Sequence, residues 1–85
     1  MPTIKLFANL RTIAGTKELS IAGASLGGVL NELEKVVPAL DGVILEDGQI
    51  RPHFVITING HNAADLDAVV MKEDILAIFP PIGGG

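Results

Sequence analysis

One amphipathic helical pattern constrains this chain more than any other feature. Apolar residues recur at the three-, four- and seven-residue spacing of a single helix face: Leu26, Val29, Leu30, Leu33 and Val37. Ser25 precedes them as an N-cap, and Pro38 follows them where a helix must stop. The sequence therefore predicts one main helix, against which the rest of the 85 residues must pack.

Four further segments have β-strand character, at residues 3–7, 17–21, 53–59 and 75–79. In the first of them, Phe7 is out of phase with Ile4 and Leu6, so its ring is expected to point away from the core. The last segment is apolar on both faces, which is typical of a buried central strand. Asn59-Gly60 predicts a type I′ turn at the end of the third strand.

The remaining segments give weaker signals. Residues 9–15 predict a connection containing one helical turn, and residues 39–50 are rich in turn-forming pairs. Residues 66–71 are expected to be short helical or extended structure.

The order strand, strand, helix, strand, strand predicts an α+β fold of the β-grasp (ubiquitin-like) type, with a mixed sheet and one main helix on one face. A single helix covers only one face of a sheet. The opposite face, which contains Phe7 and Phe79, is expected to be partly open, and exposed apolar surface of that kind marks a partner-binding site.

Composition excludes several classes of function. The chain has no cysteine, so disulfides, thiolate nucleophiles and thiolate metal ligands are excluded. A net charge of -4 with six scattered basic residues argues against nucleic acid binding. No apolar run approaches the roughly 18 residues of a membrane span, and residues 1–7 do not resemble a secretory signal. A cytoplasmic protein is expected.

Other motifs favour structural roles. Residues 23–28 enter the helix like a phosphate loop but lack its Lys-Ser/Thr ending, so close backbone packing is the better interpretation. His53 and His61 show no metal-ligand spacing. The acidic residues near the last strand are expected to form a solvated turn face: Asp65, Asp67, Glu73 and Asp74. Neither a bound metal nor a bound cofactor is expected, and without a catalytic triad pattern an autonomous enzyme is not expected.

The chain ends in Gly83-Gly84-Gly85. Pro80-Pro81 cannot donate ladder hydrogen bonds, so they should end the last strand and project the tail. Residues 1–82 are expected to form the folded domain and residues 83–85 a flexible reactive tail. Glycines lack side chains and can thread a narrow channel, which would bring the Gly85 carboxylate to a partner's nucleotide for activation.

The ending from Phe79 to Gly85 resembles that of MoaD-type sulfur carriers of the MoaD/ThiS family, which includes the small subunit of molybdopterin synthase. Further similarity lies in residues 5–11, Gly15, Ile58-Asn59 and Glu73-Asp74, so the resemblance covers most of the chain.

This resemblance implies a ubiquitin-like fold and a function as a sulfur carrier in molybdenum cofactor biosynthesis. Gly85 would be the adenylation and thiocarboxylate site. The implied partners are a ubiquitin-activating-type (MoeB/ThiF-like) adenylating enzyme that uses ATP and Mg, a cysteine desulfurase or rhodanese as sulfur donor, and the MoaE-like large subunit of molybdopterin synthase. The implied partner-binding residues are Phe7, Arg11, Phe79, Pro80, Pro81, Ile82, Gly83 and Gly84.

Two departures from the simplest members leave the pathway open. Residues 46–53 form a longer stretch, and His61-Asn62 is polar where an apolar contact would be expected. The alternatives are a carrier for cysteine, thiamine or tRNA thiolation, or a ubiquitin-like modifier conjugated to lysines. Arg51 and His53 are interpreted either as partner contacts or as a solvated pair at a strand edge.

Overall fold

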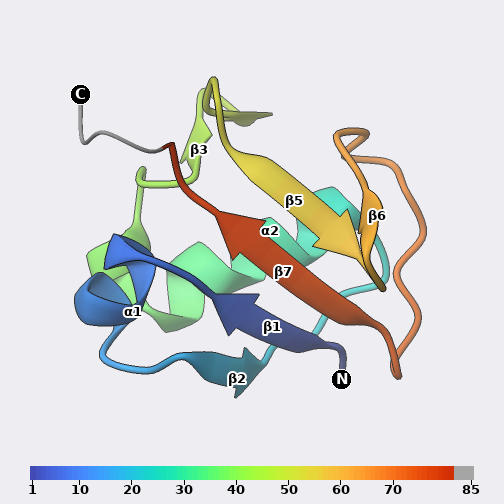
Figure 1. Ribbon diagram of the computed structural model, residues 1–85. Coiled ribbons are helices and arrows are strands. Elements are labelled where there is room, and N and C mark those ends of the chain that lie inside the picture. The colour runs from blue at the N-terminus through green and yellow to red at the C-terminus, as the bar shows by residue number, and fades with distance from the viewer. Residues whose placement is uncertain (82–85) are drawn as a thin grey trace.

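A computed structural model of the chain describes residues 1–81 and arranges them as a sheet with one long helix behind it (Figure 1). The elements, in chain order, are β1 (Thr3–Leu6), α1 (Asn9–Ala14), β2 (Glu18–Ser20), α2 (Leu26–Val36), the 3-10 helix η1 (Pro38–Leu40), β3 (Leu45–Glu46), β4 (Gln49–Ile50), β5 (Val55–Ile58), β6 (His61–Asn62) and β7 (Ile75–Phe79). No helix among these residues is long and apolar enough to cross a membrane.

The main sheet has the strand order β2-β1-β7-β5-β6. β1 runs parallel to β7, and the other neighbouring pairs are antiparallel. β7 therefore lies at the centre, as its apolar sequence predicts, and the sheet is mixed. The predicted β-grasp arrangement is confirmed.

The main helix forms where its pattern predicts. Ser25 caps α2, its Oγ accepting a hydrogen bond of 3.1 Å from the Gly28 N–H. The predicted apolar face lies against the sheet, with Leu26, Val29, Leu30 and Leu33 all fully buried. Each such leucine contributes roughly 1.5–3 kcal/mol by leaving water. Since this helix covers one face only, the other face of the sheet is open (Figure 1).

Close backbone packing at the helix entrance is also confirmed. A Cβ placed on Gly23 would lie 2.6 Å from Val29 Cγ2, and one on Gly27 would lie 3.2 Å from the Leu66 carbonyl oxygen. Glycine is required here because the chain enters α2 under a neighbouring loop.

The structure differs from the sequence-based expectation in three segments. Residues 66–71 are neither helix nor strand; their backbone carbonyls instead accept hydrogen bonds from the first amides of α2, Leu26 N to Ala68 O (2.9 Å) and Gly27 N to Leu66 O (2.8 Å). The turn-rich stretch contains the small hairpin β3–β4, and the short strand β6 follows the confirmed Asn59-Gly60 turn. In the connection after β1, α1 exceeds the one helical turn expected.

Candidate functional site

Two aromatic rings meet at one end of the open sheet face. Phe7 directly follows β1, and Phe79 is the last residue of β7. Because these strands are parallel and Leu6 pairs with Ile78, the next residues along each strand come side by side. The ring centroids lie 4.5 Å apart with an interplanar angle of 17°. Both side chains are half-buried, which confirms the outward phase predicted for Phe7.

Arg11 joins this pair from α1. Its guanidinium carbon lies 5.0 Å from the centroid of the Phe7 ring, and its Nε donates a hydrogen bond of 2.8 Å to the Leu6 carbonyl oxygen. The contact with the ring is a cation–π interaction. Arg11 is otherwise exposed, so it both fixes Phe7 and presents a cation beside it.

The chain leaves the sheet next to the aromatic pair. β7 ends at Phe79, paired with Val55, and Pro80 and Pro81 follow without amide hydrogens to extend the ladder. The predicted site residues Ile82, Gly83, Gly84 and Gly85 lie outside the described residues. The five other predicted site residues come together in one place: Phe7, Arg11, Phe79, Pro80 and Pro81.

Four of these residues, Phe7, Phe79, Pro80 and Pro81, form one wall of a groove of about 940 Å³ together with Ala8. The other wall is the loop that precedes β5, residues 51–54, together with Val55. The sequence leaves two interpretations open for Arg51 and His53, as partner contacts or as a solvated pair at a strand edge. Phe54-Val55 follow them as an apolar pair, of which Phe54 packs against the core and Val55 is 47% exposed.

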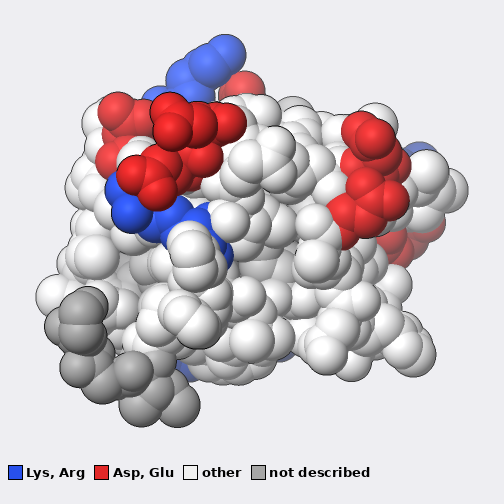
Figure 2. Space-filling view, turned by 90° about the horizontal axis from the view of Figure 1, so that it is seen from above, with Lys and Arg blue, Asp and Glu red and all other residues white. Residues whose placement is uncertain are grey.

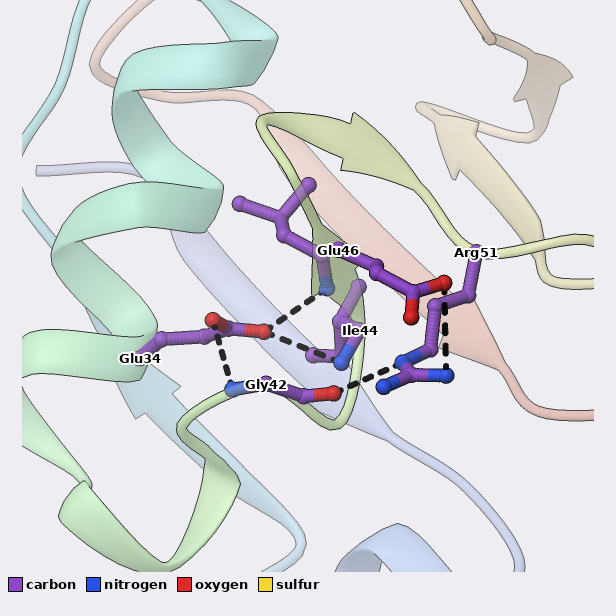
Figure 3. A network of polar contacts seen from close by, with 6 residues as sticks. Glu34, Gly42, Ile44, Glu46 and Arg51 are labelled. Atoms are coloured by element: carbon purple, nitrogen blue, oxygen red, sulfur yellow. Dashed lines mark hydrogen bonds and ion pairs between the residues drawn. The ribbon is translucent and has the colours of Figure 1, made fainter.

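A buried carboxylate positions the loops behind this second wall. Glu34 lies next to Leu33 among the buried residues of α2, and its side chain reaches the loop at residues 41–45 (Figure 3). Its Oε1 accepts a hydrogen bond from the Gly42 N–H at 3.1 Å, and its Oε2 accepts from the Ile44 and Leu45 N–H groups at 2.9 Å each. Glu34 is only 8% exposed. The helical pattern does not predict the burial of Glu34, because a single glutamate on a helix is usually solvated.

Arg51 extends this network toward the groove. Its Nε donates a hydrogen bond of 2.7 Å to the Gly42 carbonyl oxygen, and its Nη1 lies 3.7 Å from Glu46 Oε1 (Figure 3). The Arg51 backbone N–H also donates to the Ile44 carbonyl oxygen at 2.8 Å. The loop carrying Arg51 and His53 is therefore held in place through contacts that begin on α2.

Charge is unevenly distributed on the side of the molecule that Figure 2 shows. Acidic side chains gather in two separate groups there, one of them adjoined by basic side chains, with a broad uncharged area between the two groups (Figure 2). The residues lining the groove include Arg51 but no aspartate or glutamate. This end of the molecule is therefore apolar to weakly basic, although the whole chain is acidic.

The acidic residues before β7 lie in or beside turns, and Asp65, Asp67 and Glu73 are exposed, as the sequence predicts. Asp74 accepts hydrogen bonds from the Met71 N–H at 2.8 Å and from Asn59 Nδ2 at 2.9 Å, and these two bonds lower the pKa of its carboxyl. Asn59 in turn accepts from the Ile75 N–H at 2.9 Å. In residues 1–81, no three His, Cys, Asp or Glu side chains gather as metal ligands would.

Comparison with known proteins gives matches over nearly all of this chain. The model of the ThiS family matches residues 4–85. Small archaeal modifier protein 3 of Haloferax volcanii is 32% identical over 88 residues, covering 96% of this chain and 96% of that protein. The molybdopterin synthase sulfur carrier subunit of Arabidopsis thaliana is 32% identical over 85 residues, covering 96% and 80%.

The fold is shared as well. The solution structure of small archaeal modifier protein 1 from Methanosarcina acetivorans superimposes with a TM-score of 0.87 and 37% identity, over 99% of this chain and 95% of that one. The similarity thus covers the sheet, the helix and the aromatic end of the chain together. On these grounds the chain belongs to the ThiS family of ubiquitin-like, β-grasp proteins, whose relatives here include archaeal modifiers and a sulfur carrier.

Proposed function

We propose that this protein acts through the carboxylate of Gly85, which a partner enzyme activates so that it is passed on as a sulfur carrier or a protein modifier. Residues 1–82 serve as the docking body and residues 83–85 as the reactive tail. The observation that carries the proposal is the exit of the chain through Pro80-Pro81 beside the Phe7–Phe79 pair. An enzyme that takes up the tail must lie against this exposed aromatic surface.

The chemistry needs groups that this chain does not supply. A carboxylate is a poor electrophile, so an adenylating enzyme with ATP and Mg²⁺ would join one Gly85 oxygen to the α-phosphate and release pyrophosphate. A persulfide sulfur would then attack the carbonyl carbon and expel AMP. A thiol would attack the donor's sulfur in the resulting acyl disulfide, forming a disulfide with the donor and releasing the Gly85 thiocarboxylate. Alternatively, a lysine amine would attack the same carbon, expel AMP, lose a proton and form an isopeptide bond.

Relatives named as modifiers support the alternative branch better than a role restricted to molybdopterin synthase. The Arabidopsis relative, a molybdopterin synthase sulfur carrier subunit, supports the sulfur branch. We therefore propose that Gly85 serves lysine conjugation, with sulfur delivery as its second use. A molybdopterin synthase large subunit and a cysteine desulfurase or rhodanese are the partners of that second use.

The proposed partner-binding residues act together. Phe7, Arg11 and Phe79 hold the adenylating enzyme, and Pro80 and Pro81 direct the tail into it. Ile82, Gly83 and Gly84 pass through its channel, where a Cβ on either glycine would collide with the walls.

Mass spectrometry of the intact protein distinguishes the two fates. The chain is incubated with a ThiF-like adenylating enzyme, ATP, Mg²⁺ and either a persulfide donor with reductant or a lysine-containing acceptor protein. Sulfur transfer gives the mass increase of one oxygen replaced by sulfur, whereas conjugation gives an acceptor lysine joined to Gly85 with loss of water. If neither product forms, although the enzyme is active on its own carrier protein, the proposal is contradicted.

A further inference from the structure

Two residues that line the groove have positive φ without being glycine. Among residues 1–81, four residues other than glycine have positive φ: Ala8 (53°), Asp47 (53°), His53 (70°) and Asn59 (52°). Asp47 and Asn59 are explained by their turns, since each precedes a glycine in a two-residue hairpin connection. The positive φ of His53 belongs to the turn Arg51–Phe54, in which Pro52 precedes it and the Phe54 N–H donates to the Arg51 carbonyl oxygen at 3.5 Å. Ala8, at φ 53° and ψ -136°, has a backbone conformation that glycine adopts more readily, and both residues line the groove. Such strain costs about 1–3 kcal/mol per residue and gathers at functional sites.

The groove also has a distinct chemical character. Most of its lining is apolar or aromatic: Phe7, Phe54, Val55, Phe79, Pro80 and Pro81. Its polar side chains are those of Arg51 and His53, and Arg11 lies against Phe7 at its edge. No carboxylate lines it, although Glu46 Oε1 lies 3.7 Å from Arg51 Nη1 outside the lining, in a chain with ten acidic and six basic residues. A surface of this kind fits an apolar side chain with a negative charge next to it.

We infer that this groove binds a short extended segment of a partner protein, in which a large apolar residue is flanked by aspartate or glutamate. The apolar side chain lies between the aromatic pair and Val55, and the carboxylate pairs with Arg51 and the imidazole of His53. The inference rests on the proposed function, because the enzyme that takes up the tail covers this groove. It goes further in assigning recognition to the loop at residues 51–54.

The size of the groove suits such a segment. About 940 Å³ is comparable to sites that enclose a ligand of drug size, and so accommodates a few side chains rather than a whole helix. The loop is also preorganised for binding, because Arg51 is fixed by Gly42 and the Glu34 network. A site that is already ordered loses less entropy on binding.

Three synthetic peptides provide the probe. Each is acetylated and amidated, has a Leu-Phe centre, and is flanked by glutamates, glutamines or lysines. They are titrated into the ¹⁵N-labelled full chain and followed by amide chemical shifts. We expect shifts concentrated at residues 7–8, 51–55 and 79, with the glutamate peptide bound about two- to fivefold more tightly than the glutamine peptide. The lysine peptide should bind most weakly.

Matched variants locate the site. Val55 in the groove and Val69 outside it are both exposed, at 47% and 71%. Val55→Asp should weaken binding of the glutamate peptide about tenfold or more, because it adds repulsion and removes apolar contact, and Val69→Asp should leave it unchanged. Arg51→Gln should bring the glutamate and glutamine peptides to similar affinities. His53→Asn should reduce the affinity difference between the glutamate and glutamine peptides in part. Asparagine is chosen because it tolerates positive φ and keeps the loop shape.

The outcomes separate this inference from the proposed function. A chain extended by one alanine after Gly85 should bind the glutamate peptide as the natural chain does, even though its terminal carboxylate is displaced. Equal binding of the glutamate and lysine peptides, equal effects of Val55→Asp and Val69→Asp, shifts confined to other residues, or no binding by any peptide would overturn the inference.

Discussion

Phe7 is held by contacts on more than one side, which is unusual for a residue on an open face. The stacked Phe79 ring and the Arg11 guanidinium both contact its ring, and Arg11 is itself bonded to the Leu6 carbonyl oxygen. An aromatic pair contributes roughly 0.5–1.5 kcal/mol beyond burial, and an exposed cation–π contact roughly 0.5–1 kcal/mol. Together they give a partner a rigid apolar surface instead of a freely rotating ring.

Replacing Ala8 with glycine tests the strain at the groove. With φ 53° and ψ -136°, Ala8 occupies a region that glycine adopts more readily. Relief of 1–3 kcal/mol of strain exceeds the 0.5–1 kcal/mol that glycine costs through the unfolded state, so Ala8→Gly should raise the free energy of unfolding by about 1 kcal/mol. Urea denaturation measures this. Ala64→Gly, at an exposed position without positive φ, is the control and should not stabilise the chain.

Asp74 should make stability depend on pH in the acidic range. Hydrogen bonds from Met71 and Asn59 lower the pKa of its carboxyl below the ordinary value of 3.8. A carboxyl whose pKa is lower in the folded state stabilises the fold above the unfolded pKa, and this contribution disappears as pH falls through the folded pKa. Below about pH 4, the free energy of unfolding should therefore fall less steeply in Asp74→Asn than in the natural chain. Identical slopes in urea denaturation from pH 5 to 2.5 would contradict this assignment.

The local sequence pattern predicts some helices and strands of this fold and not others. Helix α2 and strands β1, β5 and β7 could be predicted, because their periodic apolar residues coincide with burial: Leu33, Ile4, Ile56 and Leu76, for example, are all at most 2% exposed. The β3–β4 hairpin and β6 could not, since two-residue strands have too few residues to show a period. Residues 66–71 satisfy α2 amides by tertiary hydrogen bonds, which no local pattern reveals.

The candidate site, too, could be predicted from the sequence only in part. The outward orientation of Phe7 and the end of β7 before Pro80-Pro81 could be predicted from the sequence. The groove was not, because its second wall depends on Glu34 bonding to a loop eight to eleven positions later in the chain. Only the folded structure shows that Arg51, which donates to Gly42 of that loop, lines the same groove as the aromatic pair.

The link between α2 and this loop makes a testable contribution to stability. Glu34→Gln replaces a carboxylate that accepts three backbone hydrogen bonds with an amide that has one acceptor and places an N–H₂ group against donors. Buried amides left unpaired cost about 1–3 kcal/mol, so the free energy of unfolding should fall by about 2 kcal/mol. Glu32→Gln, which removes only an exposed ion pair of 3.8 Å with Lys35, should change it by less than about 0.5 kcal/mol.

At the scale of the whole molecule, stability and recognition depend on opposite faces of the sheet. Helix α2 covers one face of the sheet (Figure 1) and buries the core. The aromatic pair and the groove lie on the opposite face. Parallel pairing of β1 with β7 brings both aromatic residues to the end where the chain leaves the sheet. Docking surface and reactive terminus therefore belong to one end of the fold, and the proposed chemistry needs both at once.

Adenylation of Gly85 is the first step of either fate, and its rate is the most direct test. ATP–pyrophosphate exchange by a ThiF-like enzyme is measured with the natural chain, with Gly85 deleted, and with one alanine added after Gly85. The proposal predicts robust exchange with the natural chain and a loss of at least about a hundredfold with both variants, while their urea denaturation stays unchanged. Equal exchange with all three chains would contradict the claim that the position of the Gly85 carboxylate determines what this protein does.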